Sequence, residues 1–308
     1  MNLQQLRYLN EIVHQGLKIS DAAKALYTSQ PGISKQIRLL EIELGIEIFV
    51  RNGKRIVAIT EPGKAVLAIA QRMLQDAKNL SEVAQEYHSQ DIGHLTVAAT
   101  HTQARYALPA VVKQFIKRYP GVKLGLHQGN PTQIAEQVLC GEADIGIATE
   151  SLMLYDELIT LPCYEWHHCV VVPPGHPLLN EKKITLQQIA QYPIITYDFA
   201  FSGRGKINDA FAKADIVPNI ALTAIDADVI KTYVDLGLGI GILAEIAFVA
   251  ERDHHLCKLE AKHLFKPNTT RIAIRKNEYL RAYTFEFIEL FEPKLTREAV
   301  AKAMHQRD

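Results

Sequence analysis

Polar side chains and free backbone amides gather where apolar runs that predict strands pass into helical patterns. The first such turn is Thr100-His101-Thr102-Gln103-Ala104-Arg105-Tyr106, and the second runs from Tyr197 to Gly205 and contains Ser202. A further strand, expected over residues 144–148, ends at Thr149. Hydroxyl and N–H groups at the start of a helix favour anions. These turns therefore suit a dehydrated oxyanion or a carboxylate, although Thr and Ser at such positions equally serve as helix caps.

The elements that must position these turns alternate along the chain from residue 95 onward. We expect strands and helices over the following residues: strands over 95–99, 122–127, 144–148, 169–172, 193–197 and 239–243, and helices over 108–119, 132–140, 186–191, 206–213 and 228–236. Such alternation predicts an α/β fold with mainly parallel sheets. Ligands of such folds bind beyond the carboxyl ends of the strands or in a cleft between subdomains.

The first sixty residues carry the pattern of a helix-turn-helix. Leucines and isoleucines from Leu3 to Ile12 repeat at helical spacing, and Gly16 ends this first helix. Ser20 is expected to cap a short second helix, and Ser29 a third that has Pro31 in its first turn. Two short helices joined by a tight turn favour DNA binding in the major groove. The alternative is an ordinary helical bundle with a solvated face.

A basic hairpin after the third helix favours the DNA-binding interpretation. Asn52-Gly53 is a strong signal for a two-residue turn between strands, so residues 49–59 are expected to form a wing. The charges of the wing should contact phosphates: Arg51, Lys54 and Arg55. The third helix should supply the remaining DNA contacts, including those to base edges: Ser29, Gln30, Pro31, Ser34, Lys35 and Arg38.

A long helix is expected from Thr60 to about Tyr87. Apolar residues within it are spaced alternately four and three apart, which is a heptad seam: Val66, Ala70, Met73, Ala77, Leu80, Ala84 and Tyr87. The seam predicts either dimerisation or packing against the helix's own domain. A dimer would place two reading heads on two half-sites of DNA.

Composition excludes several classes of protein. The chain has 308 residues with 34 basic and 34 acidic side chains, and no apolar stretch approaches the length of a membrane span. The N-terminus lacks the features of a secretory signal, and four scattered cysteines do not form a disulfide framework, so we expect a cytoplasmic protein. Residues 1–64 contain nine basic and six acidic side chains, so a basic head adjoins a slightly acidic body.

Metal binding and catalysis are the other functions that we considered. Cys163, His167, His168 and Cys169 lie close in sequence, as do His254, His255 and Cys257, but neither group has zinc-site spacing. No nucleophile elbow, phosphate loop or HExxH run is present. We therefore expect no metal, no cofactor and no enzyme activity. An anion-binding enzyme of the same fold and a solute-binding protein remain as alternatives from other classes.

Together these residues resemble the LysR-type transcriptional regulators, and within them the CysB and Cbl branch. The head is similar over residues 3–8, 27–37 and 44–46. The body is similar over runs typical of that branch: residues 100–109, 127–136 (which include Asn130), 161–164 and 226–234. The resemblance covers essentially the whole chain.

The resemblance implies a winged helix-turn-helix over 1–60, a linker helix over 61–90 and an effector-binding domain over 91–308. That domain would contain two Rossmann-like subdomains of periplasmic-binding-protein type, about 91–163 with 267–308, and about 164–266. The resemblance implies regulation of sulfur-assimilation and cysteine biosynthesis genes, with acetylserine, sulfate, thiosulfate or adenosine phosphosulfate as effector. It also implies residues that line the effector site: Thr100, Thr102, Gln103, Thr149 and Ser202, which stands where the branch has a threonine. Trp166 is implied as a neighbour of the site or as a packing aromatic, and His101 and Asn130 in the matching runs are further candidates.

The expected partners are promoter DNA, the effector, RNA polymerase and further copies of the chain, with no membrane. A weakly basic head attracts few phosphates by itself, so several heads must bind one DNA together. We therefore expect the chain to bind DNA as a multimer: the heptad seam favours a homodimer, and the resemblance implies a homotetramer. A Cbl-like regulator of sulfonate and sulfate-starvation genes that senses adenosine phosphosulfate is the alternative within the family.

Overall fold

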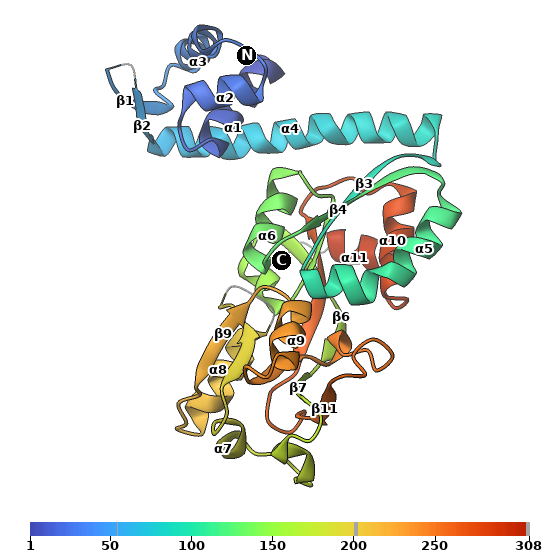
Figure 1. Cartoon of the computed structure of the whole chain (residues 1–308). Coiled ribbons are helices and arrows are strands. Elements are labelled where there is room, and N and C mark those ends of the chain that lie inside the picture. Colours follow the sequence, from blue (N-terminus) through green and yellow to red (C-terminus); the bar gives the residue numbers. More distant parts are fainter. Residues whose placement is uncertain (54, 200–202, 306–308) are drawn as a thin grey trace. The chain divides into compact units, whose positions relative to one another are not determined.

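The computed structural model describes residues 1–53, 55–199 and 203–305, and it contains two compact units (Figure 1). The first unit contains Met1–Tyr87 and the short segment Asn277–Tyr279. The second contains His88–Lys276 and the chain from Leu280 onward. Among the described residues, no helix is both long enough and apolar enough to span a bilayer.

The first unit begins with the three helices that the sequence predicts. These are α1 (Leu3–His14), α2 (Ile19–Ala25) and α3 (Gln30–Leu44), followed by the hairpin of β1 (Phe49–Asn52) and β2 (Arg55–Ile59). Ser29 caps α3 by accepting the N–H of Gly32 at 3.2 Å, as expected. The helices share one apolar core with Phe49 of the hairpin. The apolar spacing therefore predicted the helix-turn-helix correctly.

Two local expectations in this unit are wrong. The second helix begins at Ile19, and its N-cap Lys18 makes no side-chain hydrogen bond, so Ser20 lies inside the helix rather than capping it. The hairpin strands end at Asn52 and Arg55, so the loop lies one residue later than the Asn-Gly turn that we expected. Gly53 has a φ of 59°, which glycine adopts without strain.

The linker helix α4 (Glu61–His88) follows the hairpin, and Thr60 caps it by accepting the N–H of Gly63 at 2.9 Å. Its first turns pack on the head, because Ala70 is buried in the head's core together with Val66. Farther along, the same seam is exposed: Met73, Leu80 and Tyr87 are 38%, 73% and 90% exposed. The first part of the seam therefore packs on the helix's own domain, and dimerisation through the exposed part stays a prediction.

The second unit contains two five-stranded sheets with the same plan. The first has the order β4 (Gly121–Gln128), β3 (Ile92–Ala99), β5 (Ile145–Ala148), β12 (Asn268–Arg275) and β6 (Leu158–Trp166). The second has the order β9 (Ile220–Ala224), β8 (Ile194–Tyr197), β10 (Ile240–Ala244), β7 (His168–Val172) and β11 (Cys257–Glu260). In each sheet three neighbouring strands are parallel to one another, and the remaining two strands each pair antiparallel with their neighbours.

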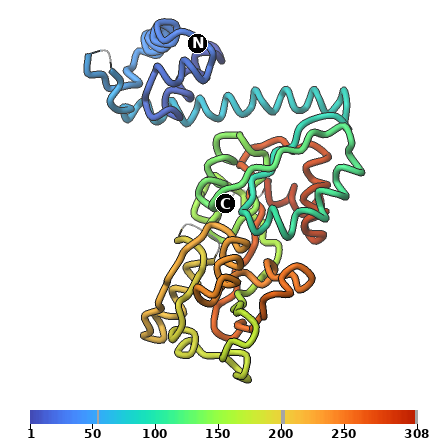
Figure 2. Tube along the Cα trace, in the orientation of Figure 1, coloured from blue at the N-terminus to red at the C-terminus, as the bar shows by residue number. Residues whose placement is uncertain are grey.

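The expectation of mainly parallel sheets is therefore wrong, since half of the strand pairings are antiparallel. Each of the antiparallel pairings involves β7 or β12, the two strands with which the chain enters a sheet after crossing from the other. The chain leaves the first sheet after β6 and enters the second with β7, and it returns from β11 to β12 (Figure 2). Four strands, β6, β9, β11 and β12, lie outside the strands that the sequence predicts.

Helices cover both faces of each sheet. In the first, α5 (Leu108–Arg118), α10 (Ala282–Phe291) and α11 (Arg297–His305) pack on one face, and α6 (Pro131–Cys140) on the other. In the second, α7 (Leu186–Ile189) and α8 (Arg204–Lys213) pack on one face, and α9 (Ala227–Asp235) on the other. We call the first sheet with its helices subdomain I and the second sheet with its helices subdomain II.

Short helical turns complete the second unit. The π-helical turn η1 (Gln103–Ala107) joins β3 to α5, and the 3-10 turn η2 (Glu150–Leu154) follows β5. Two further 3-10 turns lie in subdomain II, η3 (Pro177–Asn180) and η4 (Glu245–Ala247). Because η1 and η2 follow neighbouring parallel strands, both lie at the carboxyl edge of the first sheet.

Candidate functional site

The turn between β3 and α5 presents buried polar groups. Thr100, Thr102 and Gln103 are between 2% and 5% exposed. The Nε2 atom of Gln103 donates to Oγ1 of Thr270 at 3.0 Å, and its Oε1 atom accepts from the hydroxyl of Tyr164 at 2.5 Å. Thr270 lies on β12 and Tyr164 on β6, so the amide is fixed against the strands that lead between the subdomains.

The turn after β5 lies beside the start of β12. Thr149 is buried, and its Oγ1 atom is 3.0 Å from Oγ of Ser151. The neighbouring Glu150 accepts the N–H of Thr269 on β12 at 3.0 Å. Its other carboxylate oxygen is 3.0 Å from Nζ of Lys206 on α8. This ion pair joins subdomain I to the first turn of α8 in subdomain II.

The N-terminus of α8 approaches the same strand from subdomain II. Its N-cap Gly203 has a φ of 76°. A Cβ atom on Gly203 would lie 2.7 Å from Nε2 of His168 and 3.0 Å from Nδ2 of Asn268, distances that allow no side chain. The backbone must therefore be glycine at this close approach. Ser202, which the resemblance places in the site, lies outside the described residues.

Several polar atoms around Gly203 are buried and have no hydrogen-bond partner among the described residues. They are Nε1 of Trp166, both ring nitrogens of His168 and Nδ2 of Asn268. The rings of Trp166 and His168 are 5.1 Å apart, and Trp166 pairs with Asn268 across β6 and β12. Each buried donor without a partner destabilises the fold by about 1–3 kcal/mol. Such a group of atoms is typical of a ligand site.

Both subdomains supply charges at this site, because Glu150 of subdomain I pairs with Lys206, and the buried Arg204 of subdomain II is a further cation. Burial lowers the pKa of His168 to about 3, so its imidazole is neutral at physiological pH. Arg204 is 4% exposed and donates from Nη1 to the carbonyl of Tyr197 and from Nε to Asn208, both at 2.8 Å. Burial lowers the pKa of Arg204, but a guanidinium remains protonated. A buried cation, helix amides and neutral donors favour a small anion.

Arg204 and Asn268 were not expected at the site from the sequence. His168 was considered only as a metal ligand, and not as a neutral buried group. Arg204 gave a usable signal, because an arginine directly follows the glycine at the expected start of a helix. Asn268 gave none, since the strand β12 was not predicted.

The structure also describes the surroundings of two other predicted site residues, Asn130 and His101. Asn130 caps α6 through a reciprocal pair of hydrogen bonds with Gln133, at 2.9 and 3.0 Å. His101 has a buried Nδ1 atom without a partner among the described residues, and a ring nitrogen of His101 lies within 4.8 Å of carboxylate oxygens of Asp226 and Asp228.

The candidate DNA-contacting face lies on α3 of the first unit. Gln30, Pro31, Lys35 and Arg38 are exposed, and Ser34 is half-buried. None of these side chains is part of the apolar core, which takes Ile33, Ile37 and Leu40 from the opposite face of the helix. The helix therefore presents its polar face to solvent, and Ser29 at its start is occupied by capping.

On the wing, Arg51 makes an ion pair within the first unit. Its guanidinium binds the buried Glu41 carboxylate through two contacts, Nη1 to Oε1 at 3.1 Å and Nη2 to Oε2 at 2.8 Å. Glu41 also accepts the N–H groups of Ile48 and Phe49 at 2.9 and 3.3 Å. Arg51 therefore fastens the hairpin to α3, whereas Arg55 is exposed. Lys54 lies outside the described residues.

Two family models match the chain, one for each unit. Residues 3–64 match the bacterial regulatory helix-turn-helix protein model of the lysR family, and residues 88–296 match the LysR substrate binding domain. The chain belongs to the LysR family of transcriptional regulators.

Relatives place this LysR-type regulator in the CysB and Cbl branch. It is 54% identical to the HTH-type transcriptional regulator SsuR of Burkholderia cenocepacia over 306 residues, which cover 99% of both chains. It is also 54% identical to the regulator CysB of the same organism over 304 residues, covering 99% of this chain and 97% of the relative. The structure of the cofactor-binding domain of the Cbl regulator matches with a TM-score of 0.67 and 44% identity, over 70% of this chain and 95% of that one.

Membership of the LysR family assigns each unit a general role. The regulator binds DNA through the helix-turn-helix of its first unit, and its second unit is the family's ligand-binding domain. The relatives are transcriptional regulators rather than enzymes.

Proposed function

We propose that this LysR-type regulator controls sulfur-assimilation and cysteine biosynthesis genes in response to a small anion bound in its second unit. The relationship to CysB and SsuR supports the choice of genes. The observation that carries the choice of ligand is the set of buried, unpartnered donors around Gly203. Acetylserine, sulfate, thiosulfate and adenosine phosphosulfate all carry the oxyanion or carboxylate that such donors would bind.

The proposed ligand would join groups from both subdomains. The polar turn of Thr100, Thr102 and Gln103 and the turn at Thr149 belong to subdomain I, whereas Gly203 and Arg204 belong to subdomain II. An anion that accepts hydrogen bonds from both sides favours one relative orientation of the subdomains. By linkage, it shifts the population toward that orientation in proportion to its differential affinity. This shift is how the ligand would alter DNA binding.

Trp166 offers a direct test, because it is the chain's one tryptophan and its indole N–H lies buried at the site. Each of the four anions is titrated into the full chain while Trp166 fluorescence and heat of binding are recorded. Thr102→Val, which removes a hydroxyl at nearly constant volume, should weaken binding about fivefold or more. Thr160→Val, a half-buried threonine on β6, is the matched control and should leave affinity unchanged. If none of the four anions binds, this assignment fails.

A second candidate within the family is a Cbl-like regulator that senses adenosine phosphosulfate. The match of the second unit to the Cbl cofactor-binding domain, at 44% identity, favours it. The same titrations separate the two, because tighter binding of adenosine phosphosulfate than of acetylserine supports the Cbl-like role. The reverse order supports the CysB-like role.

We also propose which groups contact promoter DNA. The polar face of α3 would read bases while its neighbours and the wing contact phosphates: Ser29, Gln30, Pro31, Ser34, Lys35, Arg38, Lys54 and Arg55. The exposure of Gln30, Lys35 and Arg38 supports this arrangement. RNA polymerase is a proposed partner at activated promoters. Gel-shift assays on promoters of sulfur-assimilation genes test the DNA assignment.

Assembly into homodimers or homotetramers is supported by α4. Met73, Leu80 and Tyr87 lie seven residues apart on one seam and are exposed, which is typical of a helix that pairs with another copy. Leu80→Asp should shift the protein toward smaller species in sedimentation velocity. Glu86→Gln, on the same helix but off the seam, should leave the distribution unchanged.

A further inference from the structure

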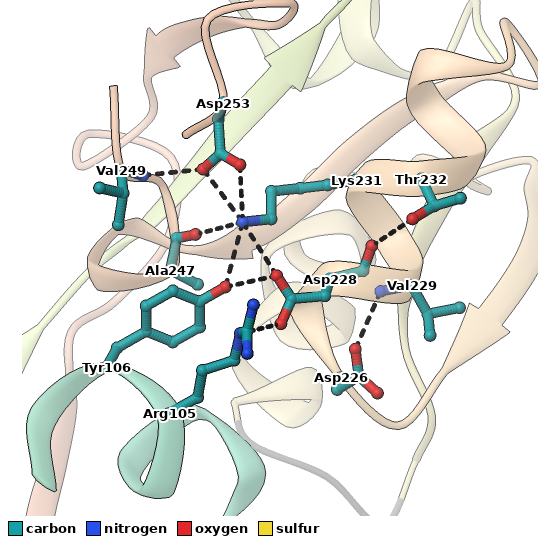
Figure 3. Close-up of polar contacts among 10 residues, drawn as sticks. All are labelled: Arg105, Tyr106, Asp226, Asp228, Val229, Lys231, Thr232, Ala247, Val249 and Asp253. Atoms are coloured by element: carbon teal, nitrogen blue, oxygen red, sulfur yellow. Dashed lines mark hydrogen bonds and ion pairs between the residues drawn. The ribbon is translucent and has the colours of Figure 1, made fainter. Parts of the chain in front are cut away.

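A network of charged and hydroxyl groups joins the two subdomains beside the proposed ligand site (Figure 3). Tyr106 on η1 donates its hydroxyl to Oδ1 of Asp228 on α9 at 2.7 Å. Arg105, also on η1, forms an ion pair with the other carboxylate oxygen of Asp228. Asp228 thus receives two adjacent residues of subdomain I at once.

Lys231 fixes the subdomain II side of this network. Its ammonium lies 3.0 Å from the Tyr106 hydroxyl, 3.2 Å from Oδ1 of Asp228 and 2.9 Å from Oδ1 of Asp253. It also donates to the carbonyl of Ala247 at 2.9 Å. Lys231 and Asp253 are 6% and 5% exposed, so their charges are shielded from water. Although burial alone would lower the pKa of Lys231, hydrogen bonds to Tyr106 and Asp253 raise it, and the ammonium stays charged.

The subdomain I side of the network is an unusual helical turn. η1 is a π-helix of five residues, Gln103–Ala107, and such turns are rare and frequent at functional sites. Gln103, held by Thr270 and Tyr164, opens this turn, while Arg105 and Tyr106 two and three residues later reach subdomain II. A movement of Gln103 toward a ligand would therefore move Arg105 and Tyr106.

A cation site is the competing interpretation of the same place, because ring and carboxylate atoms of His101, Asp226 and Asp228 lie within 4.8 Å of one another. The carboxylates are already committed, however. Asp228 accepts from Tyr106 and pairs with both Arg105 and Lys231, and Asp226 caps α9 by accepting the N–H of Val229 at 2.9 Å. A divalent cation would be repelled by the two fixed cations.

We infer that Arg105, Tyr106, Asp228 and Lys231 form a latch that holds the subdomains in one orientation and couples it to Gln103. The Tyr106 hydroxyl is its central atom, since it binds the carboxylate and the ammonium together. The coupling part of this inference rests on the proposed function, whereas the latch itself does not. A second pair, Glu150 with Lys206, joins the subdomains without touching the latch residues.

The latch is tested first without ligand, by hydrogen–deuterium exchange on the full chain. Tyr106→Phe removes the hydroxyl and keeps the ring. It should raise the exchange of residues 103–107 and 227–235 about fivefold, the effect of removing one hydrogen bond on local opening. Tyr233→Phe is the control, because this tyrosine lies on α9 and its hydroxyl has no partner in the described parts of the chain. Equal exchange in both variants and the native chain would overturn the latch.

Asp228→Asn gives a second route to the same answer. It keeps the side chain's shape and weakens the contacts to Arg105 and Lys231, so it should raise exchange in the same two segments. Combined with Tyr106→Phe, the change should be smaller than the product of the separate changes, because both variants break one shared contact. A simple product would mean that the two residues act independently and would count against the latch.

The coupling is tested with sulfate and with acetylserine, each added alone. In the native chain either anion should alter the exchange of 227–235, and in Tyr106→Phe this response should shrink about fivefold while the anion still binds. An undiminished response with binding intact would overturn the coupling. If neither anion binds the native chain, the coupling to these two ligands is overturned, and the ligand-free exchange still decides the latch.

Discussion

The polar face of α3 and the polar groups around Gly203 differ in their exposure to water. On α3, Gln30, Lys35 and Arg38 are exposed, so water satisfies them until DNA replaces it. Around Gly203, the donors of Trp166 and Asn268 are buried and lack partners among the described residues. An exposed group gains little from any single contact, because it exchanges water for a phosphate or a base. A buried donor gains much more from a ligand that reaches it.

This difference explains how each unit achieves selectivity. A surface of weak contacts depends on many groups and on several copies of the chain. A small buried site depends on few groups, and a ligand that leaves one of them unpaired is strongly rejected. The head contains one exception, the buried Glu41 beneath the wing, where four hydrogen bonds converge on one carboxylate.

The largest expected effect concerns that exception. Glu41→Ala should lower the stability of the first unit by about 3–5 kcal/mol, because it leaves the Arg51 guanidinium and two buried N–H groups without their acceptor. Hydrogen exchange of residues 1–60 in increasing urea measures it. Glu43→Ala is the control, since Glu43 is exposed and pairs only with the N-terminal amine at the surface, and it should change stability by less than about 1 kcal/mol. If Glu41→Ala lowers stability as little as Glu43→Ala does, the four hydrogen bonds to Glu41 do not stabilise the head.

A glycine pair tests the buried site next. Gly203→Ala should lower the stability of the second unit by about 1–3 kcal/mol because of its positive φ, and should abolish anion binding because its Cβ displaces His168 and Asn268. Gly205→Ala, two residues later within α8, meets nothing within 4 Å, so it should leave anion binding unchanged and should not lower stability, because Ala favours a helix more than Gly does. Urea unfolding and anion titration, both followed by Trp166 fluorescence, compare the two. Normal binding by the Gly203 variant would show that the ligand lies elsewhere.

The two regions also differ in how far the sequence predicted them. Helical spacing and the cap at Ser29 determine α3 locally, so the exposed face could be read directly from the pattern. The buried site is assembled by β6 and β12, which pair across more than a hundred residues of chain. No local pattern encodes that pairing, and the polar turns alone fitted ligand binding and helix capping equally.

Particular residues show where local reasoning was insufficient. Arg51 looked like its basic neighbours on the wing, and only the packing of α3 against the hairpin brought Glu41 within reach of it. Asn268 lies on a strand that the sequence did not reveal, and its unpartnered amide lies beside Gly203 of the other subdomain. The turn at Thr100 was predicted in the right place. The sequence did not indicate that the π-helix after it contacts α9 through Tyr106 and Asp228.

A base-reading residue should show a moderate effect. Arg38→Ala is expected to weaken binding to a promoter site by about 1–3 kcal/mol if the guanidinium contacts a base edge. Arg72→Ala, which removes an exposed arginine of α4, serves as the control and should leave affinity within about 0.5 kcal/mol. Gel shifts at fixed salt, on the promoter site and on unrelated DNA, measure the change. Equal weakening on both DNAs would assign Arg38 to phosphate instead.

Because His168 is neutral in the folded chain, it should make the free energy of unfolding fall by about 1.4 kcal/mol for each unit by which the pH is lowered below about 6.5. Burial lowers its pKa in the folded chain to about 3, below the value of an exposed histidine. Its contribution to stability is therefore complete above about pH 6.5 and is lost as the pH falls toward 3, because only the unfolded chain takes up the proton. His168→Gln should unfold in urea with a shallower dependence between pH 6 and 4. Parallel curves for the two proteins would contradict a neutral buried histidine.

The smallest effect separates the two wing arginines. Arg55→Gln should reduce the slope of log affinity against log salt by about 0.9, the value for a single phosphate that is no longer neutralised, and should leave the stability of the head unchanged. Arg51→Gln should do the reverse, because its guanidinium is held by Glu41: stability falls, and among folded molecules the salt slope stays the same. Affinity measured over a range of salt, below the unfolding transition of both variants, gives the two slopes. If Arg51→Gln lowers the slope as much as Arg55→Gln, the guanidinium leaves Glu41 for a phosphate when DNA binds, and the head's buried carboxylate then belongs to recognition as well as to stability.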